Sequence, residues 1–247
     1  MCGIWGSLSS DESHIKGIQA YEAAATIRKR GPERTRTLEV DWGTFVFHRL
    51  AINGLEESHD QPYIYVHPHN PKVKFLVMCN GEIYNYQELA REIQWSGEAK
   101  CDTEVIFAAF QHTQFNFEAL YNLLYGEYAL AIVMYDTKGP MCIWMSVDAC
   151  SVRPLFYSVT TRASGVNVTF SSLLSGVKDC ESPMRLQSGE MLNVNFHTNE
   201  VTKEKWWNWD RKFEWETKDD FTDPYVIRRH IVTTLEACVA RRLHSDR

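Results

Sequence analysis

A cysteine directly after the initiator methionine constrains this chain more than any other feature. In Met1-Cys2-Gly3-Ile4-Trp5-Gly6 the small side chain of Cys2 permits removal of Met1, which leaves a free α-amino group beside a thiol. An α-amine titrates near ~7.7–8.0 and a thiol near ~8.5, so the amine can take the thiol proton. Cys2 would then be nucleophile and base together. The alternative is a buried free cysteine. The flanking glycines indicate a short buried strand whose backbone approaches a neighbour closely.

Composition narrows the class of protein. The 247 residues suffice for one large domain or two small ones, and a net charge of −6 argues against nucleic-acid or anionic-membrane binding. We see no signal peptide, and the most apolar run, at 128–135, is too short to span a bilayer. Seven cysteines without a CxxC pair favour reduced thiols and argue against a disulfide framework or a Cys-based zinc site. These features predict a cytoplasmic protein.

Helix and strand signals run through the first 195 residues. The segment 56–71 is polar and proline-rich, and it is predicted to be a loop. His67 and His69 within it have no third ligand nearby, which is more typical of a solvated loop than of a metal site. Two sheets with helices outside would bury the predicted elements. We predict helices at about 14–29, 85–97, 102–111 and 117–124, and strands at 35–40, 42–47, 74–79, 128–135, 141–147, 155–159, 166–170 and 190–195.

The C-terminal part has a different character. Residues 206–222 combine tryptophans with dense charge and are predicted to be a linker. Asp223-Pro224 then has the signature of a helix start. Ile227, Ile231 and Leu235 fall on one side of that helix, and this apolar stripe needs a partner. We expect residues 223–247 to open a further domain.

Four separated sequence blocks resemble a known family. The chain is similar to the glutaminase domain of class II glutamine amidotransferases, which are N-terminal-nucleophile hydrolases, and most similar to the asparagine synthetase branch. The resemblance implies an α+β fold, a four-layer αββα sandwich of two mainly antiparallel sheets. It implies a glutaminase domain at 1–205, a linker at 206–222, and at 223–247 the first helix of a synthetase domain. The blocks are Cys2-Gly3-Ile4, Arg30-Gly31-Pro32-Glu33, Arg49-Leu50-Ala51-Ile52 and Asn80-Gly81-Glu82-Ile83-Tyr84-Asn85.

The resemblance also implies the roles of individual residues. Cys2 would attack the side-chain amide of glutamine, form a γ-glutamyl thioester and release ammonia. Asn80 and Gly81 would stabilise the oxyanion. Arg49 would bind the substrate α-carboxylate. Glu82 and Asp102 would accept hydrogen bonds from the α-ammonium. The backbone of Leu50, Ala51, Ile52 and Asn53 would line the pocket. The implied site contains no metal.

Each of these residues also has an ordinary structural explanation. Arg49 could form a surface ion pair, Asp102 could be only a helix cap, and Asn80-Gly81 could be only a turn. The chain departs from the family pattern at Asn53, where aspartate is usual. It also departs at Val147 and Ser151 of an RDxxGxxPL segment, and at Leu173.

The function implied is that of a ligase of asparagine biosynthesis. Ammonia would pass to an ATP-dependent synthetase domain in cis that converts aspartate to asparagine. ATP and Mg would serve only that domain, and glutamine hydrolysis needs no cofactor. The partners implied are glutamine and the synthetase domain, with homodimerisation left open. Two alternatives remain: a different ammonia acceptor, or a non-catalytic scaffold relative.

Overall fold

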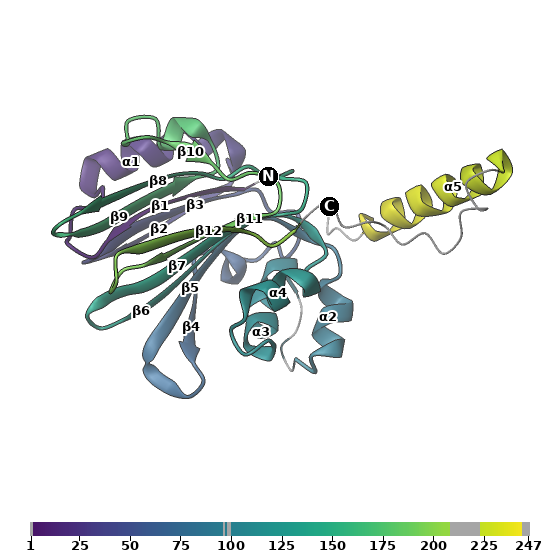
Figure 1. Ribbon diagram of the computed structural model, residues 1–247, viewed down its shortest axis with the longest axis horizontal. Helices are drawn as coiled ribbons and strands as arrows, with labels where there is room; N and C mark the ends of the chain where they lie inside the picture. The colour runs from purple at the N-terminus through teal and green to yellow at the C-terminus, as the bar shows by residue number, and fades with distance from the viewer. Residues whose placement is uncertain (1, 96, 98–99, 208–222, 244–247) are drawn as a thin grey trace.

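Two six-stranded antiparallel sheets form the centre of the molecule (Figure 1). The computed structural model describes residues 2–95, 97, 100–207 and 223–243. The first sheet has the strand order β10-β8-β9-β1-β3-β2, and the second has β12-β11-β7-β6-β5-β4. The first contains β1 (Gly3–Ser9), β2 (Arg34–Val40), β3 (Gly43–Arg49), β8 (Phe156–Arg162), β9 (Gly165–Ser171) and β10 (Met184–Arg185). The second contains β4 (Tyr63–His67), β5 (Asn70–Ile83), β6 (Gly126–Asp136), β7 (Gly139–Val147), β11 (Glu190–Asn195) and β12 (Glu200–Lys205).

Helices cover the outer faces of both sheets. The helix α1 (Gly17–Ala25) packs on the first sheet, where Ala20 and Ala24 meet Trp5. The helices α2 (Tyr86–Glu92), α3 (Val105–His112) and α4 (Phe117–Leu123) pack on the second sheet. The short 3-10 turns are η1 (Arg28–Arg30), η2 (Glu57–His59), η3 (Asp102–Glu104) and η4 (Leu174–Gly176). The layers therefore run helix, sheet, sheet, helix, which confirms the predicted fold class.

The strand β1 shows why the N-terminal block folds as it does. All seven of its residues are buried, because it lies inside a sheet that is covered on both faces. Ile4 faces the core between the sheets and Trp5 faces α1. Burying an aromatic side chain of roughly 200 Å² contributes about 5 kcal/mol before entropy costs. A Cβ on Gly6 would lie 2.5 Å from the ring of Phe170, so the expected close approach is confirmed.

Several predicted elements need correction. The helix expected at 14–29 is shorter than predicted and consists of α1. It does not begin at His14 because the N–H groups of His14 and Ile15 donate to the hydroxyls of Ser9 and Ser7, which hold that segment against β1. The expected loop at 56–71 was wrong. It contains β4, which pairs with a β5 that is longer than the predicted strand, and the ring of His67 stacks on Phe75. The two edge strands β10 and β12 were not predicted.

Two polar side chains at predicted helix starts, Asn85 and Asp102, do not act as helix caps. The Asn85 side chain does not cap α2; it donates to the Leu123 carbonyl at 2.9 Å and accepts from the Tyr125 N–H at 3.0 Å. Asp102 is not a cap either, because Cys101 and Glu104 form the capping box of η3. Both polar side chains are used in contacts between distant elements, which the local sequence pattern does not reveal.

The helix α5 (Pro224–Arg241) projects from the sandwich (Figure 1). Its predicted start is confirmed, since the Asp223 carboxylate accepts the Tyr225 N–H at 2.8 Å. None of its residues is buried, and Leu235 is 59% exposed. Most of the predicted linker, 208–222, lies outside the described residues, while Trp206 packs on Tyr121. No helix in the part of the chain described here is long and apolar enough to span a bilayer.

Candidate active site

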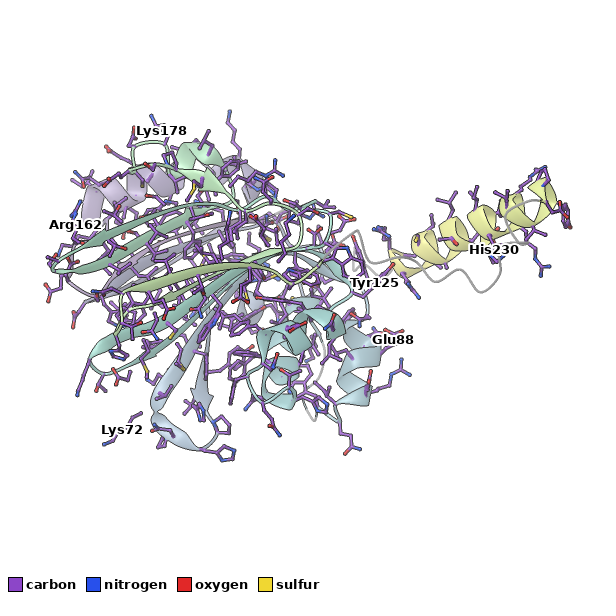
Figure 2. The ribbon with its side chains drawn as sticks, viewed as in Figure 1. Lys72, Glu88, Tyr125, Arg162, Lys178 and His230 are labelled. Carbon is purple, nitrogen blue, oxygen red and sulfur yellow. The ribbon has the colours of Figure 1, made fainter. Side chains whose placement is uncertain are left out.

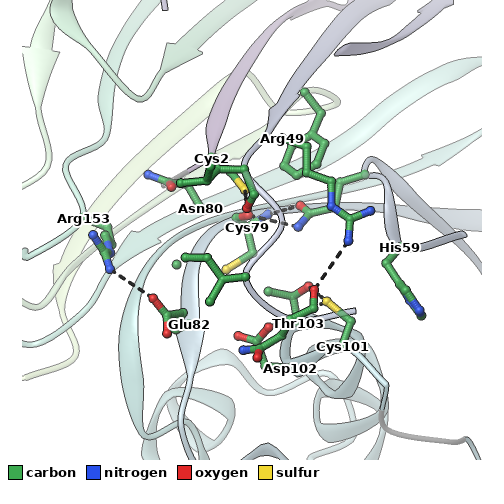
Figure 3. Close-up of a pocket in the computed structure, with 16 residues that line it drawn as sticks. Cys2, Arg49, His59, Cys79, Asn80, Glu82, Cys101, Asp102, Thr103 and Arg153 are labelled. Carbon is green, nitrogen blue, oxygen red and sulfur yellow. Dashed lines mark hydrogen bonds and ion pairs between the residues drawn. The ribbon is translucent and has the colours of Figure 1, made fainter. Parts of the chain in front are cut away.

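A cavity lies where the start of β1, the end of β3 and the C-terminal part of β5 meet (Figure 3). It brings together nearly all of the residues singled out in the sequence, from segments up to a hundred positions apart. Ala51 is not part of its lining; its N–H binds the Glu33 carboxylate at 3.0 Å. The predicted site residues that do line it are Cys2, Arg49, Leu50, Ile52, Asn53, Asn80, Gly81, Glu82 and Asp102.

The Cys2 thiol is half-buried at the cavity wall. It donates a hydrogen bond to the Leu50 carbonyl oxygen at 3.4 Å, and the Arg30 guanidinium holds the Cys2 carbonyl at 3.0 Å. Burial raises the pKa of the Cys2 thiol, although the Leu50 contact and the positive charge of Arg49 oppose this rise. A thiol with a raised pKa is protonated at neutral pH. It therefore needs a base before it can act as a nucleophile.

The Asn80 side-chain amide is fully buried beside that thiol. Within the described ranges, neither its nitrogen nor its oxygen has a hydrogen-bond partner. An unsatisfied buried amide costs about 1–3 kcal/mol, and such an exception calls for an explanation. Because Asn80 lies inside β5 and pairs with Ala129 of β6, the turn that could have explained Asn80-Gly81 is excluded. A donor held ready for a ligand would explain the orphaned amide.

The neighbouring strand β6 leaves no room for a side chain at Gly81. A Cβ there would overlap the Glu127 carbonyl oxygen and lie 2.6 Å from the Tyr128 Cα. These are backbone atoms that cannot rotate away. Any larger residue would force β5 and β6 apart, so only glycine fits at this close approach.

The Arg49 guanidinium is buried, with 3% of the residue exposed. It forms an ion pair with Asp60 and donates to the carbonyl oxygens of Glu56, at 2.6 Å, and of Gly54. Asp60 also binds Arg34 at 2.9 Å. Arg49 thus belongs to a buried network rather than a surface pair. It shapes the loop that carries Asn53 while lining the cavity.

Asp102 and Glu82 supply negative charge at the opposite wall. The Asp102 carboxylate accepts the Ile83 N–H at 2.7 Å, and Glu82 lies 3.5 Å from the Arg153 guanidinium. Burial raises the pKa of Asp102 to about 6, helped by the charge of Glu82, while hydrogen bonds from Ile83 and Asn53 oppose the rise. The family departure at Asn53 therefore supplies a hydrogen bond to Asp102.

The raised pKa of Asp102 predicts a pH dependence of stability. Between its ordinary value of 3.8 and about 6, the folded protein binds this proton more tightly than the unfolded chain does. This contribution to folding is present at low pH and is lost as the pH rises through 6, by roughly 3 kcal/mol at most. Asp102→Asn should flatten the stability curve between pH 4 and 7 in urea titrations. The exposed Asp179→Asn is the control, and parallel curves for Asp102→Asn and wild type would refute the assignment.

The sequence analysis missed seven residues of the cavity lining: Phe47, His59, Gln61, Cys79, Cys101, Thr103 and Arg153. Arg153 is carried by a loop that folds around the buried Asp148 carboxylate. This carboxylate accepts N–H groups of Cys150 at 2.9 Å, Val152 at 3.1 Å and Arg153 at 3.3 Å. The segment had been noted as a family block, but no local signal showed that its arginine reaches Glu82. Val147, which replaces the family arginine, is buried in the core between the sheets.

Ser151 stands in the same loop at the family's glycine position. Its φ of 53° lies in the left-handed region, where a Cβ costs roughly 1 kcal/mol. Ser151→Gly should therefore raise the free energy of unfolding by about 0.5–1 kcal/mol in urea titrations. Ser151→Ala is the matched control, because it also loses the contact of the hydroxyl with Arg185 but keeps the Cβ. A glycine variant no more stable than the alanine variant would contradict this account of the loop.

The described residues hold no group of three or more His, Cys, Asp or Glu side chains arranged for a metal ion. The cavity instead gathers the Cys2 thiol, the unpartnered Asn80 amide, and the charged side chains of Arg49, Arg153, Glu82 and Asp102. Two stacked antiparallel sheets, with a cysteine directly before an inner strand, agree with the N-terminal-nucleophile hydrolase fold that the sequence resemblance implied.

Among proteins with this fold, the chain belongs to the glutamine amidotransferase domain family, whose model matches residues 1–208. Its curated relatives include asparagine synthetases (glutamine-hydrolyzing). The Gallus gallus protein is 32% identical over 164 residues, which cover 65% of this chain and 27% of that protein. The nodule enzyme of Pisum sativum is 28% identical over 249 residues, covering all of this chain and 39% of the relative. The resemblance seen in the sequence is thereby confirmed.

The chain spans well under half the length of these relatives. Among solved structures, the glutamine phosphoribosylpyrophosphate amidotransferase from B. subtilis superposes with a TM-score of 0.62 at 17% identity. The match covers 83% of this chain and 49% of that one. At this identity the likeness shows the fold alone, and it agrees with the two-sheet sandwich described above.

Proposed function

We propose that this domain hydrolyses the side-chain amide of glutamine to glutamate and ammonia through a covalent Cys2 intermediate. The observation that carries the proposal is the buried, unpartnered Asn80 amide in the same cavity as the Cys2 thiol. A donor kept dry and unoccupied beside a nucleophile is what an oxyanion-stabilising site requires. This arrangement argues against the non-catalytic alternative.

The proposed reaction proceeds in two halves. After removal of Met1, the α-amine of Cys2 accepts the thiol proton and the sulfur attacks the amide carbon. The oxyanion receives hydrogen bonds from the Asn80 amide and the Gly81 N–H. The carbon–nitrogen bond breaks as the leaving nitrogen takes a proton, and ammonia departs. Water then attacks the thioester, which releases glutamate and returns the thiol.

Substrate recognition follows from the charges around the cavity. The α-ammonium is proposed to bind between Asp102 and Glu82, and the α-carboxylate at Arg49. Backbone groups from Leu50 to Asn53 complete the lining. Since the Arg49 donors already bind Asp60 and loop carbonyls, a substrate carboxylate must share or displace one of these acceptors. Glutamine binding would thus rearrange the 53–56 loop.

Arg49→Ala is expected to raise the glutamine KM by about 30- to 1,000-fold, equivalent to about 2–4 kcal/mol. Arg49→Lys should recover only part of this loss, because an ammonium cannot form the two-pronged contact. Initial-rate kinetics on protein shown to be folded would measure both values. Asp60→Asn is the control: it disturbs the ion pair but keeps the guanidinium, so its KM should change less. An unchanged KM in both Arg49 variants would place the carboxylate elsewhere.

We further propose that the ammonia serves an ATP-dependent asparagine synthetase domain, in a cytoplasmic protein of asparagine biosynthesis. This rests on the names and lengths of the relatives, of which this chain spans 27% to 39% in the two cited cases. Residues 1–205 would then be the glutaminase domain and 223–247 the first helix of the synthetase domain, which would bind ATP and Mg. Sequencing the gene tests this choice of acceptor. A synthetase domain encoded after residue 247 would support it, and a different domain there would favour another acceptor.

Glutamine carrying a heavy nitrogen isotope in its amide group tests the proposed activity directly. The chain should release labelled ammonia and glutamate in equal amounts. Asparagine, whose side chain is one methylene shorter, should be a poor substrate because the anchors at Arg49 and Asp102 would misplace its amide. Folded protein that releases neither product would refute the proposal.

A further inference from the structure

The C-terminal end of α5 meets the rim of the sandwich through two arginines. The Arg242 guanidinium lies 2.9 Å from the Glu127 carboxylate, and its carbon lies 4.7 Å from the ring centroid of Tyr84. Arg241 lies over the Tyr125 ring at 4.6 Å. Figure 2 shows Tyr125 on the edge of the sandwich that faces α5. Most of the remaining helix surface is exposed, so these contacts are specific to its last turn.

The receiving surface is built entirely by the sandwich. Two aromatic faces and a carboxylate form a suitable environment for a guanidinium group. Tyr84 follows β5 and Tyr125 precedes β6, and the Tyr84 N–H donates to the Tyr125 carbonyl at 2.8 Å. The Asn85 side chain ties the same two segments together. The rings and the carboxylate are thus held in place independently of α5. We call Tyr84, Tyr125 and Glu127 the arginine cage.

The cage is connected to the cavity by alternating charges. The second oxygen of Glu127 lies 3.4 Å from Arg153, whose guanidinium also lies 3.5 Å from Glu82. Arg153 and Glu82 both line the cavity that contains Cys2, and Figure 3 shows the Arg153–Glu82 pair at its edge. The side chains of Arg153 and Glu127 are only 12% and 19% exposed, so solvent screens this chain of charges incompletely.

We propose that the arginine cage docks the last turn of α5 and that this docking opposes glutamine binding. The second half of this proposal rests on the proposed function of the cavity. Glu127 is shared by two guanidinium groups, and Glu82 would be shared by Arg153 and the substrate α-ammonium. When Arg242 occupies Glu127, Arg153 is held more tightly by Glu82. When α5 leaves, Arg153 turns to Glu127 and Glu82 is free for the substrate.

Hydrogen exchange tests the docking without any ligand. Arg242→Ala should speed amide exchange in the last turn of α5, because an isolated helix of this length is marginal in water. Glu127→Gln and Tyr84→Leu should do the same, and the double variant Arg242→Ala/Glu127→Gln should show no further increase. Arg228→Ala, at the exposed start of α5, is the matched control. Unchanged exchange in these variants would refute the docking of α5 on the arginine cage. Protection that depends on protein concentration would show that the α5 of a second copy occupies the cage.

Glutamine binding tests the coupling. Calorimetry in the Cys2→Ser background avoids turnover, and there Arg242→Ala should bind glutamine about two- to fivefold more tightly than Arg242 protein. Arg228→Ala should leave the affinity unchanged. By reciprocity, glutamine should speed exchange in the last turn of α5 in the parent protein. Equal affinities would overturn the coupling while leaving the cage intact. Absence of glutamine binding in every variant would overturn both the coupling and the proposed function, and the exchange result would still decide the cage.

Discussion

Replacing Cys2 with serine is expected to reduce ammonia release from glutamine by about 10⁴-fold or more, while the variant still folds and binds glutamine. The hydroxyl is far less acidic than the thiol, so an α-amine base cannot generate a comparable nucleophile. The change replaces one atom of a half-buried side chain, and we expect the fold to tolerate it. Coupled detection of ammonia and calorimetric titration of glutamine would separate loss of chemistry from loss of binding.

The matched control for this experiment is Cys101→Ser. This buried thiol lines the same cavity and lies 3.5 Å from the Thr103 hydroxyl. It has no proposed part in the reaction, so its activity should stay within a few-fold of the parent. Retained glutamate production in Cys2→Ser would remove the nucleophile assignment. Intact mass spectrometry should also show Met1 absent, and full activity with Met1 retained would exclude the α-amine as base.

Truncating Asn80 to alanine is expected to lower kcat by about 10²–10³-fold with little change in KM. Its amide would contact the substrate oxygen most strongly once negative charge develops there. The same substitution removes a buried amide without a partner in the described structure, so it should not lower stability as much as an ordinary core truncation. Activity and thermal stability should therefore respond very differently.

Two observations would contradict this account of Asn80. One is an unchanged kcat in Asn80→Ala. The other is a variant that loses stability and activity in proportion, which would make Asn80 structural. Asn80→Asp is the isosteric control: it keeps the shape but offers a negative charge where the oxyanion forms, so it should be at least as inactive as the alanine variant.

The sequence was informative wherever local pattern and chemistry coincide. The blocks around Cys2, Arg49 and Asn80 predicted which segments form the cavity, and the β-rich runs at 128–135 and 141–147 became β6 and β7. The hairpin of β4 was missed because its polar and proline-rich surroundings hide the short aromatic and β-branched run from Tyr63 to Val66. Side-chain stacking of His67 stabilises it, and that is a tertiary contact.

The ion pairs around the cavity could not be predicted from the sequence. The Asp60 carboxylate that pairs with Arg49 belongs to the segment 56–71, which was predicted to be a loop. The link of Arg153 to Glu82 and Glu127 joins residues from three separate parts of the chain. Such pairs depend on strand order and loop closure, which no local periodicity encodes. The positive φ of Ser151, by contrast, agrees with the glycine that the family has at that position, because glycine adopts positive φ readily.

Cys2 is proposed to form a covalent bond with the side-chain amide carbon of glutamine. Peptide mapping after reaction with a glutamine analogue that carries an electrophilic diazo ketone in place of the amide tests this most directly. We predict a single adduct, on the peptide that begins with Cys2, and its suppression by excess glutamine. Cys79 and Cys101, which line the same cavity, should remain unmodified. An adduct on either of these thiols, or none on Cys2 while glutamine is still hydrolysed, would contradict the account.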